Sequence, residues 1–183
     1  MSKQNTPRGR PQNKELTRQV LSQTLIALAN KGYNGTSTQL IAETTNTSKQ
    51  ALYRRWPSKA ALATDALRNG FRLVPPTYPG ISSFQNDLQE AITNILTALH
   101  DTPLGNAWLA LLSEPALAEE LALIEGEQRT HLRQIFVYWN STSMMETSID
   151  QLMGFLFFTT LIRRRKPSSE EISSILQGIA QRS

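Results

Sequence analysis

A short polar segment at residues 48–50 carries side chains that can hydrogen-bond to the edges of nucleic-acid bases. Ser48, Lys49 and Gln50 follow one another at the expected start of a helix. A lysine ammonium suits the guanine acceptors or a phosphate, and a glutamine amide can pair with an adenine edge. A short helix that presents its first turn can place such groups in a major groove. This segment is therefore a candidate base-reading surface.

Further donors follow the segment within one or two helical turns. Tyr53, Arg54 and Arg55 carry groups that suit phosphate oxygens. Lys59 falls in the expected first turn of the next helix, where free backbone N–H groups already attract an anion. Trp56 occupies an inward position in this pattern, and we expect it to close a small helical core.

Capping residues set the boundaries of the helices that must hold these groups. We expect a helix over residues 14–31 that ends at a left-handed Gly32, followed by a capping box at residues 36–39. Asn46 tolerates the left-handed conformation and is expected to turn the chain before Ser48 caps the next helix. Two short helices joined by a tight turn and supported by a longer one are typical of a helix-turn-helix.

These residues carry a family resemblance. Residues 32–37 (GYNGTS), residues 41–42 (IA) and residues 48–62 (SKQALYRRWPSKAAL) resemble the DNA-binding domain of TetR-type transcriptional regulators, over about residues 14–67. The resemblance implies an all-helical, homodimeric repressor. Its N-terminal helix-turn-helix would read a palindromic operator in double-stranded DNA, and its C-terminal domain would bind a small-molecule effector and dimerise through the last two helices.

The resemblance also implies roles for single residues: Thr36 and Ser37 at a phosphate, Lys49 and Gln50 at bases, Tyr53 and Lys59 on the DNA backbone. Three positions depart from the family pattern. Gln50 replaces a usual glycine, Arg55 a usual histidine, and residues 45–47 an alanine-glycine-hydrophobic turn. These changes concern the operator sequence rather than the fold. The candidate DNA-binding set is Thr36, Ser37, Ser48, Lys49, Gln50, Tyr53, Arg54, Arg55 and Lys59.

The charge of the chain is strongly divided along its length. The 183 residues carry a formal net charge of +4. Residues 1–72 hold 12 basic and 3 acidic side chains, whereas the rest holds 7 basic and 12 acidic ones. A segment with a net charge of +9 suits a polyanion, and the remainder, at −5, does not. Arg8 and Arg10 lie in a basic arm at residues 1–13, which either enters a minor groove or has no defined structure.

Several other classes of protein are disfavoured. The absence of cysteine excludes disulfide scaffolds, and a polar, basic N-terminus without an apolar segment predicts a cytoplasmic protein with no membrane partner. His100 and His131 lack the spacing of metal ligands. No nucleophile, phosphate-loop or dinucleotide motif is present. We therefore expect no catalytic residue, metal or cofactor, and no enzymatic activity.

A proline-rich segment at residues 75–80 marks the clearest break in the chain. Helical periodicity on both sides predicts an all-α protein of about nine helices, four before the break and five after it. One of the later helices is expected to run from Glu146 to Arg165. The predicted organisation is a flexible arm (1–13), a helix-turn-helix domain (14–73) built on three helices, and an effector-binding and dimerisation domain (81–183).

The effector pocket is placed by the resemblance alone, among the helices of residues 81–140 and the start of the next helix. The candidate lining residues are the amphipathic aromatic side chains Trp108, His131, Tyr138 and Trp139. The acidic balance of this half of the chain favours a neutral or cationic ligand.

Residues 152–158 are apolar on every side of their expected helix, which predicts burial all round. One face can meet the core of the chain, and the other then needs a partner. The candidate dimer interface is Ile149, Met153, Gly154, Leu156, Phe157, Ile172, Ile175, Leu176 and Ile179. The alternative is an interior helix of a monomer.

These observations together predict a sequence-specific transcriptional regulator, most simply a repressor that an effector releases from its operator. Two alternatives stay open. One is a DNA-binding protein that responds to no ligand. The other is a ligand-binding or interaction protein whose helix-turn-helix no longer binds DNA.

Overall fold

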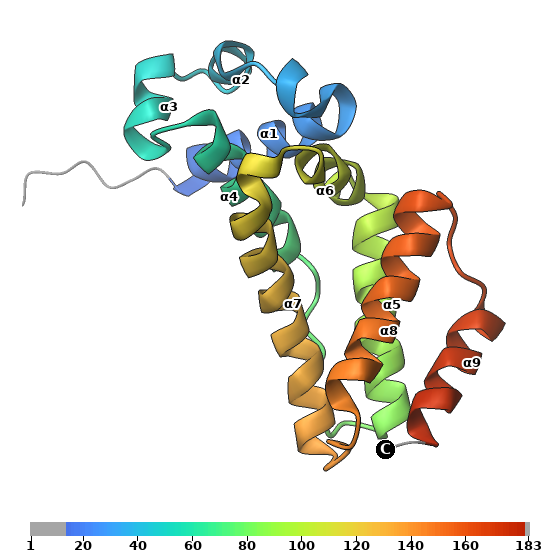
Figure 1. Cartoon of the computed structure of the whole chain (residues 1–183). Helices are drawn as coiled ribbons and strands as arrows, with labels where there is room; N and C mark the ends of the chain where they lie inside the picture. The colour runs from blue at the N-terminus through green and yellow to red at the C-terminus, as the bar shows by residue number, and fades with distance from the viewer. Residues whose placement is uncertain (1–13, 182–183) are drawn as a thin grey trace, which may run out of the picture.

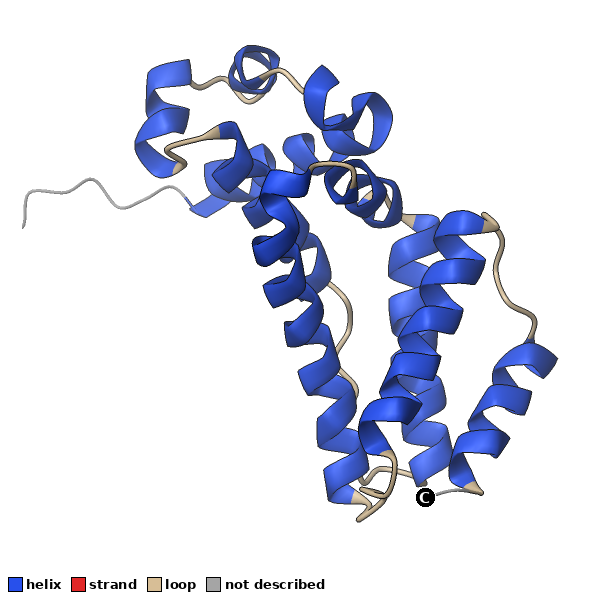
Figure 2. Cartoon of the chain, in the orientation of Figure 1, coloured by secondary structure: helices blue, strands red, loops and turns tan. Residues whose placement is uncertain are grey.

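Nine α-helices form most of the regular structure in residues 14–181, the part of the chain that this computed structural model describes (Figures 1 and 2). Their bounds are α1 Lys14–Gly35, α2 Thr38–Thr44, α3 Lys49–Arg55, α4 Lys59–Arg72, α5 Phe84–Asp101, α6 Leu104–Leu112, α7 Ala118–Tyr138, α8 Met145–Phe157 and α9 Ser169–Ala180. A 3-10 turn, η1 (Pro115–Leu117), precedes α7, and a π-helical turn, η2 (Phe158–Ile162), follows α8. The predicted arm at residues 1–13 lies outside the described residues.

The short helices α2 and α3 lie at one end of the molecule, and the long helices α5, α7 and α8 extend away from them (Figure 1). α1 packs against both α4 and α6, so it joins the two ends. α9 packs on α5. The all-α architecture, with an N-terminal helix-turn-helix and a helical C-terminal part, agrees with the prediction.

Serine side chains cap several helices as the sequence predicts. Ser48 Oγ accepts a hydrogen bond from the Ala51 N–H over 3.1 Å, and Ser58 Oγ accepts one from the Ala61 N–H over 3.0 Å. Ser168 and Glu171 form a complete capping box at the start of α9. These caps satisfy backbone N–H groups that a helix leaves without an internal partner.

The turns around α2 include one confirmed position and one correction. Gly32 takes the predicted left-handed conformation at φ 69°, although a short helical turn then continues to Gly35. The predicted capping box from Thr36 is wrong. Ser37 caps α2 through a bond from the Leu40 N–H, and the Thr36 hydroxyl instead donates to the Gly32 carbonyl over 2.7 Å. The tight turn at Gly32 brings that carbonyl within reach.

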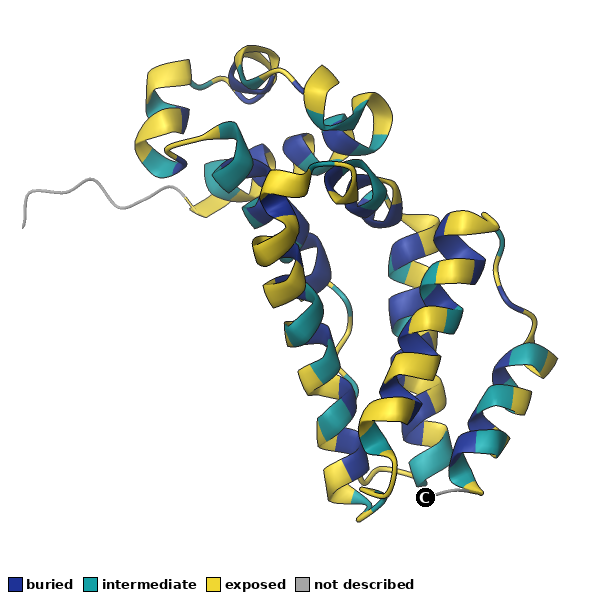
Figure 3. Cartoon of the chain, in the orientation of Figure 1, coloured by how far each residue is buried: buried dark blue, intermediate teal, exposed yellow. Residues whose placement is uncertain are grey.

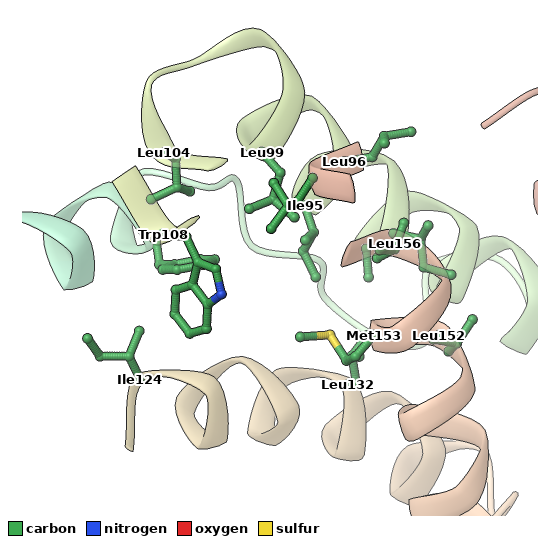
Figure 4. Packing of buried hydrophobic residues seen from close by; sticks show 14 of the residues in the cluster. Ile95, Leu96, Leu99, Leu104, Trp108, Ile124, Leu132, Leu152, Met153 and Leu156 are labelled. Carbon is green, nitrogen blue, oxygen red and sulfur yellow. The ribbon is translucent and has the colours of Figure 1, made fainter. Parts of the chain in front are cut away.

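Two hydrophobic cores share the first and fourth helices (Figures 3 and 4). The smaller core fills the helix-turn-helix and consists of Val20, Leu21, Ile41, Ala42, Leu52, Trp56, Leu62 and Ala66. The larger core contains Leu28 of α1 and Leu67 and Phe71 of α4 together with α5–α9. Side chains of α6, α7 and α8, among them Trp108, Leu132 and Met153, meet in it (Figure 4).

The helix predicted from Glu146 to Arg165 is shorter than expected. α8 passes into η2, which ends at Ile162, and Arg164 takes a positive φ of 51°. The basic residues that follow are held by carboxylates of other elements. Arg165 forms two hydrogen bonds with Glu171, and Lys166 donates to Asp101 over 2.5 Å. These ion pairs fix the loop that leads to α9.

Among residues 14–181, no helix combines the length and the apolar character that crossing a membrane requires.

Candidate DNA interface

The start of α3 is held outward by a left-handed turn and a serine cap. Asn46 lies at φ 49°, which reverses the chain after α2, and Ser48 caps the first turn of α3. Leu52 points into the small core, so the opposite side of this short helix faces solvent. Lys49 and Gln50 are exposed on that side. Both predicted base-reading side chains are therefore exposed at the start of the helix.

Trp56 anchors the other end of α3. Its side chain is buried in the small core, as predicted. Its indole N–H donates to the Asp65 carboxylate of α4 over 2.8 Å. The bond gives a buried polar group its partner and ties α3 to α4.

Tyr53 is 39% exposed on the same side of α3 as Lys49. The Lys49 Nζ lies 5.9 Å from the centre of the tyrosine ring, within the range of a weak cation–π contact. The Tyr53 hydroxyl shares a hydrogen bond of 3.2 Å with the Thr38 hydroxyl at the start of α2. Thr38 is an orienting residue that the sequence reasoning missed, because nothing in the sequence pairs it with a residue fifteen positions away.

Lys59 is oriented by the end of α1. Its Nζ donates to the Asn34 carbonyl over 3.4 Å and lies 4.5 Å from the centre of the Tyr33 ring. Burial, and to a lesser extent the charge of Glu114, raise the pKa of the Tyr33 hydroxyl. Ser37 is exposed beside this group, but Thr36 is 4% exposed and its hydroxyl is used within the fold. The predicted phosphate contact of the Thr36 side chain is therefore corrected.

The two arginines at the end of α3 differ in their surroundings. Arg54 is exposed, and among the described residues it has no ion-pair partner. Arg55 is half-buried and donates to the Thr17 hydroxyl of α1 over 2.8 Å. The histidine-to-arginine departure at this position thus adds a link between α3 and α1.

The four aromatic residues predicted to line an effector pocket do not come together. Trp108 packs in the large core against Phe157, with ring centres 5.6 Å apart, and it borders a separate cavity of about 280 Å³. Trp139 donates its indole N–H to Asp87 over 2.8 Å, and Tyr138 is 57% exposed. Only His131 lines the cavity between α4, α5 and α7, which has a volume of about 230 Å³. Helical spacing alone did not separate core positions from cavity positions.

The predicted dimer residues differ in how far their own chain buries them. Eight of the nine point into the core of their own chain or pack against it: Ile149, Met153, Leu156, Phe157, Ile172, Ile175, Leu176 and Ile179. Phe157 and Ile175 are only partly buried there and keep some exposed surface. Gly154 alone is exposed. It shares its face of α8 and η2 with Phe158 and Ile162, which are 53% and 63% exposed.

Within residues 14–181, no group of three or more metal-ligating side chains gathers in one place. His100 instead contacts the carboxylate of the adjacent Asp101 over 2.9 Å.

Known proteins resemble this chain in sequence and in fold. A sequence model of bacterial regulatory proteins of the tetR family matches residues 20–66. The uncharacterized HTH-type transcriptional regulator Rv1556 of Mycobacterium tuberculosis is 26% identical over 170 residues, which cover 88% of this chain and 84% of that protein. The corresponding regulator YdeS of Bacillus subtilis is 26% identical over 172 residues, covering 85% and 83%.

Solved structures share the fold at lower identity. A tetR-family transcriptional regulator from Streptomyces coelicolor superposes with a TM-score of 0.69 at 17% identity, covering 92% of this chain and 80% of that one. AibR, solved in complex with isovaleryl coenzyme A and operator DNA, gives 0.60 at 16% identity, covering 91% and 97%. The matched segment, residues 20–66, contains the whole of α2 and α3 and the outward-facing Lys49 and Gln50. Residues 20–66 thus form a DNA-binding helix-turn-helix domain of the tetR family, and the chain as a whole has the fold of TetR-family transcriptional regulators, which are not enzymes.

Proposed function

We propose that this protein is a homodimeric repressor that binds a palindromic operator and leaves it when a small molecule binds in the C-terminal part. The observation that carries the proposal is the presentation of α3. Its first turn is capped, points outward and carries exposed Lys49 and Gln50. The operator would be chromosomal DNA, so we place the protein in the cytoplasm.

We assign base reading to Lys49 and Gln50, whose charged and amide groups match guanine and adenine edges. Ser37, Ser48, Tyr53, Arg54 and Lys59 would contact phosphates around them, because all five offer a donor at the same end of the molecule. Arg55 would act mainly through its bond to Thr17.

We propose that two copies associate through the exposed face of α8 and η2. Gly154 presents no side chain there, and Phe158 and Ile162 expose apolar surface beside it. A helix face of this kind allows close approach of a second helix. Symmetric pairing would place two copies of α3 about 34–36 Å apart, one turn of the DNA helix, or a multiple of that distance.

The cavity between α4 and α7 would hold the effector. AibR, which has the same fold, was solved with both an acyl coenzyme A and operator DNA. In this chain the cavity contacts Phe71 and Arg72 at the end of α4, and the same helix begins at Lys59. A ligand that binds more tightly to one position of α4 would therefore shift the equilibrium between the conformation that binds DNA and the one that does not.

The test is fluorescence anisotropy with labelled duplexes from the region upstream of the protein's own gene. We expect binding by two chains per duplex, with affinity falling on the order of a thousandfold between low and moderate salt. A duplex of unrelated sequence is the control and should bind more weakly. Absence of binding to every upstream fragment would contradict the proposal. DNA binding that no small molecule weakens would favour the ligand-independent alternative.

A further inference from the structure

The cavity between α4, α5, α7 and the segment after α4 combines an apolar interior with a few nitrogen donors. Its volume is about 230 Å³. The apolar lining consists of Phe71, Val74, Pro75, Pro76, Ala91, Ile95, Leu132 and Ile135. Arg72, Thr77, Gln128 and His131 also line it. No carboxylate of the described residues does so.

Gln128 contributes an amide to the wall of this cavity. Its side chain is 7% exposed and lies among the lining residues. An amide can both donate a hydrogen bond to a ligand and accept one from it.

Helices α4 and α7 carry charged or polar side chains at two successive turns. Arg68 of α4 and Glu127 of α7 form an ion pair of 3.0 Å. Four residues further along each helix, the corresponding positions are Arg72 and His131, which are both exposed to solvent and both line the cavity. In the Arg68–Glu127 pair a cation meets a carboxylate. Arg72 and His131 instead bring two nitrogen groups to one site, and an anion is the group that complements them.

We propose that the cavity binds a small monocarboxylate, with its carboxylate between Arg72 and His131 and within reach of the Gln128 amide. The apolar part of the ligand lies against Phe71, Ile95 and Ile135. A cavity of about 150 Å³ holds benzene, so this one suits a molecule of roughly nine non-hydrogen atoms. The lining thus points to an anion, although the acidic balance of this half of the chain favours a neutral or cationic ligand.

The inference rests on the proposed function, since it names the ligand class of the proposed effector site. It adds a specific route to the DNA-binding helices. Arg72 is the last residue of α4 and Lys59 is the first. A carboxylate that joins Arg72 to α7 would hold the end of α4 against α7, one turn beyond the Arg68–Glu127 pair.

The experiment is calorimetric titration of the full chain with benzoate, phenylacetate and hexanoate. Phenylacetamide and phenethylamine serve as neutral and cationic probes of matched size. We expect one of the carboxylates to bind with one molecule per chain, and the neutral amide to bind at least about tenfold more weakly. Arg72→Met should weaken carboxylate binding by about tenfold or more, because it removes a charge-assisted contact. Arg164→Met, an exposed arginine far from the cavity lining, should leave it unchanged.

Gln128→Leu provides a second variant that removes the amide and keeps the size of the side chain. Circular dichroism melting curves check that each variant folds. Weaker carboxylate binding by both Arg72→Met and Gln128→Leu supports the assignment. Three results would overturn it: none of the carboxylates binds, the amide or the amine binds as tightly, or Arg72→Met has no effect.

Operator release is measured separately by anisotropy, so that the two proposals can fail independently. A carboxylate that binds through Arg72 but leaves the DNA complex intact would support the ligand class and contradict effector release. A neutral or cationic molecule that releases the DNA equally well from the Arg72→Met variant would support effector release and overturn the ligand class.

Discussion

The indole N–H of Trp56 donates to the carboxylate of Asp65 over 2.8 Å, and this bond joins the end of α3 to α4. A second bond of the same kind and length joins Trp139 to Asp87 in the C-terminal part. The molecule therefore contains two matched tryptophan–aspartate pairs, one beneath the DNA-reading helix and one far along the chain. A comparison of variants at Trp56 and at Trp139 therefore separates an effect on DNA binding from an effect on stability.

Trp56→Phe should lower both the free energy of unfolding and the affinity for DNA. The substitution leaves Asp65 without its donor and opens a small void, at a cost of about 1–3 kcal/mol. Trp139→Phe loses the corresponding bond and should cost a similar amount. Chemical denaturation measures the first effect and anisotropy the second. We expect only Trp56→Phe to weaken DNA binding, and an equal loss of affinity in both variants would contradict the positioning role of Trp56.

Lys49→Ala and Lys59→Ala should weaken DNA binding in different ways. Loss of Lys49 removes a base contact and should relax sequence preference, at a cost of about 1–3 kcal/mol at the affected base pair. Loss of Lys59 should weaken binding to all sequences and reduce the salt dependence. Anisotropy against operator and scrambled duplexes at several salt concentrations distinguishes the two.

Lys166→Ala is the control for this pair, because its ammonium pairs with Asp101 in the C-terminal part. It should change neither specificity nor salt dependence. Indistinguishable profiles for Lys49→Ala and Lys59→Ala would refute the division into base reading and phosphate binding.

Gly154→Glu should convert a dimer to a folded monomer. Beyond its own helical turn, a Cβ atom at Gly154 would meet no atom of residues 14–181 within 4 Å, so one copy tolerates the substitution. Across a two-fold axis it would place charge and bulk in the proposed contact. Light scattering measures the mass, and circular dichroism checks the fold.

Gly126→Glu supplies the matched control, since Gly126 also lies in a helix with no neighbour within 4 Å of its Cβ position. This variant should keep the dimer. If Gly154→Glu still scatters with twice the chain mass, the two copies do not meet on this face of α8.

The Arg165–Glu171 pair should make thermal stability depend on pH. Hydrogen bonds from Arg165, and a further one from the Ser168 N–H, lower the pKa of the Glu171 carboxyl from 4.5 to about 2. Because the pKa is lower in the folded state, the carboxylate stabilises the fold above about pH 4.5. That stabilisation is lost as the pH falls toward 2.

Glu171→Gln should therefore melt at a lower temperature than the native protein near neutral pH, and the difference should vanish near pH 2. Glu170→Gln changes the neighbouring exposed carboxylate, which has no ion-pair partner among the described residues, and is the control. A melting difference that stays constant with pH would show that the effect of Glu171→Gln is not electrostatic.

The sequence predicts the DNA-reading end of the molecule well because that end follows local rules. A left-handed asparagine, a serine cap and an inward tryptophan each depend on residues within a few positions, and Asn46, Ser48 and Trp56 all behave as predicted. The choice between two adjacent hydroxyl residues failed there, and the first helix continues past Gly32 to Gly35. Ser37 caps α2 because Thr36 is drawn to the Gly32 carbonyl.

The C-terminal part is predicted less well because its surfaces are decided by contacts between distant helices. An apolar stretch such as residues 152–158 shows that a helix is buried, but not which side its own chain covers. Met153 faces inward and Gly154 outward, and the two are adjacent in sequence. Contacts between distant helices also decide where cavities form. Gln128 and Arg72 meet the same space only because α4 and α7 lie together.

The sharing of α1 and α4 between two cores limits how evolution can recombine this protein. Leu28 and Leu67 belong to the larger core, whereas Val20 and Ala66 on the same helices belong to the smaller one. A chimera joined at the proline-rich segment would therefore present one face of α1 and α4 to a foreign sensor. Such a hybrid works only if residues before the junction change together with those after it.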